Sequence, residues 1–153
     1  MKKLILGFIM IVLANNVFCQ DLLISNLIHL RTLDAISAND YLSKRGWQFK
    51  SSSEMGEEGA AVASWVFPNT PHQVSLINDF KNSRFIASFD TTNKGFIDRF
   101  KIDLLAKSAK LVESKIGSDS IQAEYSFNNL RVLFVVQKED EITRYTIYVV
   151  NPD

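Results

Sequence analysis

Three alternating apolar runs near the C-terminus constrain the fold most strongly. The runs cover Ser120 to Phe127, Leu130 to Gln137 and Ile142 to Val150. Alternation of apolar and polar residues is the period of a half-buried β-strand. Asn128 and Asn129 separate the first two runs, and both residues tolerate the positive φ angles of a two-residue hairpin turn. The sequence therefore predicts an antiparallel meander over residues 120–150.

The middle run is apolar on both of its faces. One face carries Leu130, Val132, Phe134 and Val136, and the other carries Leu133 and Val135. Such a strand is typical of the interior of a sheet, because an apolar face needs cover or a partner. We expect this strand to be central and covered on both sides, or covered on one side and partnered on the other.

A helical pattern precedes the meander. In residues 96–116 apolar side chains recur at spacings of three and four and form one broad face, with charged residues opposite. Asn93 is a suitable N-cap and Gly117 a suitable C-terminal stop. Asp103 and Lys107 form a favourable i,i+4 pair. The sequence predicts one long amphipathic helix packed on an antiparallel sheet.

The first half of the chain repeats the order of helix and then strands. Residues 22–45 have helical spacing, with a second start at Ser37 and a stop at Gly46, which predicts a short helical pair. Strand patterns follow at Gly46 to Lys50, at Ala60 to Phe67, between Pro71 and Ser83, and at Arg84 to Asp90. The third of these fits a helical turn about as well, and we favour a strand. Trp47 and Phe49 share one face, and we expect both in the core.

These elements predict an α+β fold. The chain divides into two helix-plus-antiparallel-meander units, with possible halves 20–92 and 93–153. The halves share little residue similarity, so a duplication is a hypothesis from the pattern of elements alone. The order of elements resembles that of small secreted bacterial proteins built from helix-plus-meander units, among them the β-lactamase inhibitor proteins. The resemblance implies an architecture, and neither a function nor a binding residue.

Residues 1–19 have the layout of a secretory signal peptide. Lys2 and Lys3 precede an apolar run from Leu4 to Leu13, and polar residues follow. A membrane-spanning helix needs roughly 20 apolar residues, about twice the length of this run. We expect cleavage after Cys19, which leaves residues 20–153 as a single exported domain, periplasmic or secreted, without stable membrane insertion.

Cys19 is the only cysteine, and it admits a second processing route as the lipidated residue of a lipoprotein. Lipoprotein signals carry small residues directly before that cysteine, whereas Phe18 is bulky, so we favour cleavage. The mature chain then has no disulfide and no thiolate ligand or nucleophile. Loss of Lys2 and Lys3 leaves 15 basic and 17 acidic residues. This near-neutral charge gives no reason to expect nucleic acid as a partner.

Residue patterns of known enzyme chemistry are weak. We expect His29 to be a partly buried helix residue and His72 to be an exposed loop residue, of which His72 is the better functional candidate. The acidic loop with Glu54, Glu57 and Glu58 lacks the spacing of a calcium loop. No nucleophile motif or phosphate loop occurs. The sequence predicts no catalytic residue, no metal and no cofactor.

The last strand carries the best binding candidates, because aromatic residues dominate the energetics of protein interfaces. Tyr148 alternates with apolar neighbours, so it faces outward if they are buried. We predict that residues 144–150 form an interaction edge, with Tyr148, Tyr145, Arg144 and His72 as binding residues.

The favoured function is a secreted or periplasmic, non-enzymatic protein-binding module of the inhibitor, immunity or envelope-adaptor type. Two alternatives remain open. One is a small periplasmic hydrolase with carboxylate or histidine chemistry, and the other is a carrier of a small apolar ligand between helix and sheet.

Overall fold

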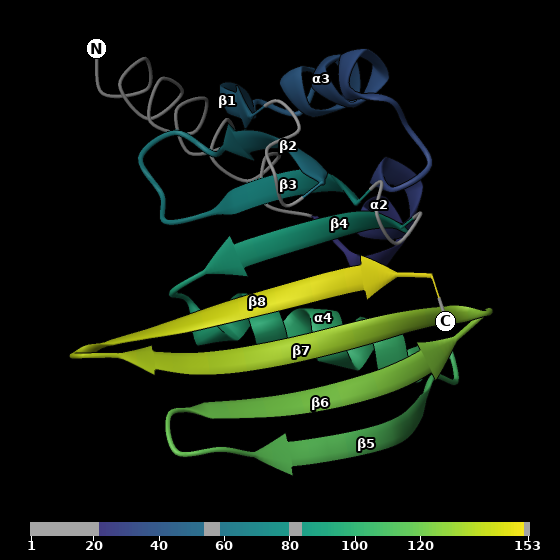
Figure 1. Cartoon of the computed structure of the whole chain (residues 1–153), viewed down its shortest axis with the longest axis vertical. Helices are drawn as coiled ribbons and strands as arrows, with labels where there is room; N and C mark the ends of the chain where they lie inside the picture. Colours follow the sequence, from purple (N-terminus) through teal and green to yellow (C-terminus); the bar gives the residue numbers. More distant parts are fainter. Residues whose placement is uncertain (1–21, 54–58, 80–83, 152–153) are drawn as a thin grey trace, which may run out of the picture.

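A computed structural model describes residues 22–53, 59–79 and 84–151 of the chain (Figure 1). These residues form three helices, α2 (Ile24–Leu30), α3 (Ala35–Ser43) and α4 (Lys94–Ala106). The strands of the first half are β1 (Gln48–Ser53), β2 (Ala60–Val66), β3 (Gln73–Asp79) and β4 (Arg84–Thr91). Those of the second half are β5 (Lys110–Ile116), β6 (Ser120–Phe127), β7 (Leu130–Glu139) and β8 (Ile142–Val150). The predicted α+β class is confirmed.

All strands of the described residues belong to one antiparallel sheet with the order β1-β2-β3-β4-β8-β7-β6-β5. The strands β1 to β4 follow one another inward from one edge, and β5 to β8 do so from the other edge (Figure 1). The two series meet where β4 pairs with β8, with Ser88 opposite Tyr148 and Phe89 opposite Ile147. We call this pairing the seam.

The C-terminal meander forms as predicted. Asn128 and Asn129 adopt φ angles of 46° and 57° and join β6 to β7 in a tight turn. Strand β7 lies between β6 and β8, so both of its edges are paired with a neighbouring strand. The prediction of an interior strand is confirmed.

The helices α2 and α4 cover one face of the sheet (Figure 1). This covered face carries a cross-strand row of apolar side chains, namely Trp65, Val74, Phe89, Ile147 and Phe134. Phe100 of α4 lies over Phe89 with 5.1 Å between the ring centroids. Both rings are almost fully buried, and complete burial of such a side chain contributes about 1.5 to 3 kcal/mol.

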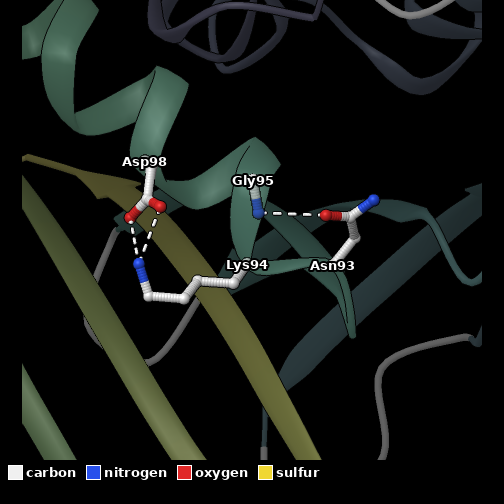
Figure 2. Close-up of polar contacts among 4 residues, drawn as sticks. All are labelled: Asn93, Lys94, Gly95 and Asp98. Carbon is white, nitrogen blue, oxygen red and sulfur yellow. Dashed lines mark hydrogen bonds and ion pairs between the residues drawn. The ribbon is translucent and has the colours of Figure 1, made fainter.

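Helix α4 begins with the predicted N-cap. The Oδ1 atom of Asn93 accepts a hydrogen bond of 2.9 Å from the backbone N–H of Gly95, and Lys94 forms an ion pair of 2.7 Å with Asp98 (Figure 2). An N-cap of this kind stabilises a helix by about 1 kcal/mol. Asn93 therefore fixes the point at which the chain leaves β4 and turns under the sheet.

The predicted long helix over residues 96–116 is wrong, because α4 ends at Ala106 and residues 110–116 form β5. Ser108 has a φ angle of 64°, and its N–H donates to the carbonyl of Leu105 at 3.0 Å. This left-handed residue closes the helix in the position that glycine usually takes. Leu111 continues the helical period, yet it lies on an edge strand with 58% of its side chain exposed.

The N-terminal helical pair is present, with a different cap from the one predicted. Asp34 caps α3, and its carboxylate accepts from the backbone N–H of Ser37 at 2.8 Å. Ser37 therefore lies in the first turn of the helix. Phe49, expected in the core, is 53% exposed because β1 is an edge strand, whereas Trp47 is buried against Phe67.

Three predictions concern parts of the chain outside the described residues. These are the signal peptide, Cys19 and the acidic loop of Glu54, Glu57 and Glu58. Within residues 22–53, 59–79 and 84–151, no helix has the length and apolar character required to cross a membrane.

Candidate functional site

The described helices leave one face of the sheet without cover, and we call it the open face. In Figure 1 this face is toward the viewer at β7 and β8, with α4 behind them. Residues paired across antiparallel strands point to the same face. The central row of the open face therefore consists of Ser51, Ser64, Ser75, Ser88, Tyr148, Leu133 and Glu124.

Four polar side chains gather on the open face at the seam, and we call them the seam cluster. They are Asp90 of β4 and Arg144, Thr146 and Tyr148 of β8. The hydroxyl of Thr146 donates a hydrogen bond of 2.7 Å to Oδ1 of Asp90, directly across the seam. Arg144 is exposed beside them, and Glu139 accepts from its Nε atom at 3.4 Å. The cluster thus places a carboxylate, a guanidinium and a phenol on two central strands.

The carboxyl group of Asp90 lies in an unfavourable environment. Burial raises the pKa of Asp90, and the hydrogen bond from Thr146 and the charge of Arg144 oppose that rise only in part. Burial raises the pKa of Tyr148 too, and the negative charge of Asp90 adds to the effect. Partial loss of solvation destabilises the charged form of a carboxyl group. Groups of this kind concentrate at functional sites.

The open face differs on the two sides of the seam. Toward β1 it carries a row of serines, of which Ser64 and Ser75 are joined by a hydrogen bond of 2.9 Å. Ser64, Ser75 and Ser88 are buried, each below 7% exposure. Toward β5 the face carries an ion pair between Glu124 and Arg131. The seam cluster therefore lies between the serine row and this ion pair on the open face, and Asp79 and Arg84 face each other on the serine side, near the end of β3.

The structure brings two of the four predicted binding residues together. Tyr148 and Arg144 both belong to the seam cluster, whereas Tyr145 lies opposite Thr91 and Val136 on the covered face. The prediction that β8 is an interaction edge is wrong, because β8 pairs with β4 on one side and with β7 on the other. The backbone N–H and C=O groups of β8 pair with β4 and β7, so only its side chains are available to contact a partner. The edges are β1 and β5.

His72 was expected to be exposed, and this prediction is wrong. The His72 side chain is 5% exposed and lies under α4, with 4.3 Å between its ring centroid and that of Phe96. Its Nδ1 atom is 2.8 Å from the hydroxyl of Thr91. Burial lowers the pKa of the imidazole, so the neutral ring is favoured. His72 and Asp90 therefore lie on opposite faces of the sheet and do not form one site.

His29 was expected to be partly buried, and it is exposed. Its ring packs against Tyr41 at 4.9 Å between centroids, where α2 and α3 meet. This packing contact accounts for a histidine at this position of α2, and no functional role is needed to explain it.

Sequence reasoning missed Asp90 and Thr146. Asp90 is the last residue of a predicted strand, where an acidic side chain is ordinary. Its importance follows from the pairing with Thr146, which is 56 residues away in the chain. Strand alternation gives the face of a residue and does not give its neighbour across a non-local pairing. The only local signal is an acidic residue inside an alternating apolar pattern.

Comparisons with known proteins provide no further guide. No family model, no curated protein and no solved structure gives a significant match to this chain. Among the residues that the structure describes, no group of three or more His, Cys, Asp or Glu side chains is arranged to hold a metal ion. The functional argument therefore rests on the geometry of the open face.

Proposed function

We propose that the protein is an exported, non-enzymatic binding module that docks a protein partner on the open face, with the seam cluster at the centre. The observation that carries the proposal is a partly desolvated carboxylate, Asp90, beside the aromatic ring of Tyr148 on a face that the described helices leave uncovered. A partner that supplies a positive charge or a hydrogen-bond donor to this carboxylate would explain why the free protein keeps a destabilising group.

The position of the cluster favours a preorganised site. Asp90 and Tyr148 come from β4 and β8, which have a strand on both sides and cannot move independently of the sheet. Binding groups on rigid elements lose little conformational freedom when a partner docks. Tyrosine is also among the residues that contribute most to protein interfaces.

The chemistry of the cluster specifies the complementary surface. A lysine or arginine of the partner would neutralise Asp90, and apolar side chains would cover the rings and methyl groups of Tyr148 and Leu133, which are opposite each other in the register. The serine row offers hydroxyl groups to backbone or side-chain donors at the rim. We therefore propose a partner with one basic residue in an otherwise apolar patch.

We further propose that residues 20–92 and 93–153 are two helix-plus-meander units that meet at the seam. The strand order supports this, because each series of four strands runs from an edge to the centre of the sheet. In the edge strands β1 and β5 every residue is exposed, and each strand has one register shift in its pairing with the next strand. In this arrangement one unit supplies Asp90 and the other supplies Tyr148, so the site requires both.

The proposal is tested by the affinity of a partner for variants of the open face. The protein is purified gently from its own host, native mass spectrometry identifies a partner that remains bound, and biolayer interferometry then measures its affinity. We expect Tyr148→Glu to weaken binding at least a hundredfold, because it removes the ring and adds a charge. We expect Asp90→Asn to weaken binding about tenfold, or roughly 1.4 kcal/mol, through the lost ion pair.

Ile102→Glu is the matched control, because Ile102 is 68% exposed on α4 and lies away from the open face. This variant should bind the partner like the wild type. A partner that binds Tyr148→Glu and Asp90→Asn with unchanged affinity would contradict the proposal, as would a partner that is lost only with Ile102→Glu.

A further inference from the structure

A cavity of about 320 Å³ lies between the α2 to α3 connection and the covered face of the sheet. Its apolar wall includes Leu33, Ala61, Ala63, Leu76 and Phe85. This volume is at the lower end of the range of small-molecule sites, which are concave, mostly apolar and fitted with few polar groups. The cavity is separate from the seam cluster, because its apolar wall belongs to the opposite face of the sheet.

Among the described residues that line this cavity, one carries a positive charge, namely Arg31 directly after α2. An Nη1 atom of Arg31 donates to Oδ1 of Asn151, which follows β8. The Nε atom of Arg31 is buried and has no hydrogen-bond partner among the described residues. Burial lowers the pKa of the guanidinium because it disfavours the charged form. A buried donor without an acceptor destabilises the folded protein.

The acidic residue nearest to Arg31 in the cavity lining is engaged elsewhere. The carboxylate of Asp34 accepts from the backbone N–H of Ser37 at 2.8 Å and from its hydroxyl at 3.2 Å, as the N-cap of α3. These bonds lower the pKa of Asp34 and keep its charge at the start of the helix. Asp34 therefore does not neutralise Arg31, and no other described residue of the cavity lining carries an acidic side chain.

We propose that this cavity binds a small amphiphile with an apolar chain and a carboxylate head group. The apolar chain lies against Leu33, Leu76 and Phe85, and the carboxylate accepts hydrogen bonds from Arg31. A carboxylate matches the planar guanidinium of Arg31 in shape and charge. The chemical class follows from the pairing of an apolar wall with one cation in the described lining.

The test uses octanoate and octanol, which share an apolar chain and differ in the head group. Isothermal titration calorimetry measures their binding to the full-length mature protein after bound lipids have been removed. We expect octanoate to bind with one site per chain and octanol to bind at least tenfold more weakly. In Arg31→Gln the affinity for octanoate should fall to the level of octanol.

Two further variants separate the site from general effects of charge and folding. Arg99→Gln removes an arginine from α4, outside the cavity lining, and should leave octanoate binding unchanged. Ala61→Phe fills the cavity and should abolish binding of both probes, with circular dichroism as the check that the variant folds. If that variant does not fold, the comparison of Arg31→Gln with Arg99→Gln still shows whether octanoate binding depends on Arg31.

The proposal is overturned if octanoate does not bind the wild type, or if Arg31→Gln binds octanoate as tightly as the wild type does. Equal binding of octanoate and octanol to the wild type would also overturn it, because the head group would then contribute nothing. Tyr148→Glu should retain octanoate binding, so this result stands or falls independently of the partner on the open face.

Discussion

The two faces of the sheet come from the same strands and carry opposite kinds of residues. On β4, Phe89 packs under Phe100 on the covered face, while its chain neighbours Ser88 and Asp90 lie on the open face. The covered face is apolar from β2 to β7. The open face carries serines, then the seam cluster, then an ion pair.

This difference shows that the core and the proposed binding surface use alternate residues of one strand. The covered face has the composition of a core. The open face is neither a core nor an ordinary charged surface, because it includes buried serines and a carboxylate with a raised pKa.

The largest effect is expected from a pair of neighbours on β4. Phe89→Ala should lower the free energy of unfolding by about 3 to 5 kcal/mol, because it opens a cavity under α4. Ser88→Ala, one residue away on the open face, should change it by less than about 1 kcal/mol. Urea unfolding followed by circular dichroism measures both. Equal losses would mean that the open face is packed as tightly as the covered face.

The next effect is a pH dependence on the covered face. The unfolded chain takes up a proton at His72 near pH 6.5, whereas burial lowers the pKa of the native imidazole. The free energy of unfolding should therefore fall as the pH drops from 7 to 5. His72→Gln should cost about 1 to 2 kcal/mol at pH 7 and flatten this dependence.

A smaller effect of opposite sign is expected on the open face. Because the native pKa of Asp90 is raised, its charged form destabilises the protein at neutral pH. Asp90→Asn should raise the free energy of unfolding at pH 7 by on the order of 1 kcal/mol. The gain should shrink toward acid pH, since native Asp90 then becomes protonated. Asp98→Asn, which breaks an exposed ion pair, should give no gain.

The smallest effect concerns the ion pair between β6 and β7 on the open face. Glu124→Gln breaks the ion pair with Arg131. The side chain of Glu124 is 28% exposed and that of Arg131 is 39% exposed. A pair this exposed contributes about 0.3 kcal/mol, and high salt should remove the difference from the wild type. Urea unfolding at low and high ionic strength measures it. A loss that persists in high salt would mean that packing, and not charge, holds this region.

The local features of the fold were predictable from the sequence. The Asn128 and Asn129 turn, the Asn93 cap and the alternating strands each depend on residues a few positions apart. Ser108 shows where this fails, because a serine took the left-handed position that a glycine would have signalled. The pairing of β4 with β8 lay beyond reach for a different reason. Alternation put Tyr148 on the face opposite to Ile147 and Val149, yet it carried no information on the neighbours Ser88 and Asp90 across the seam.

The most direct test of the central claim is site-specific photocrosslinking in the native host. A photoreactive phenylalanine analogue replaces Tyr148 on the open face or Ile102 on α4. We expect one discrete crosslinked product with a second protein at position 148, none at position 102, and a lower yield of the product when Asp90→Asn is added. Crosslinks of equal yield at both positions, or an unchanged yield at position 148 with Asp90→Asn, would contradict a docking site at the seam.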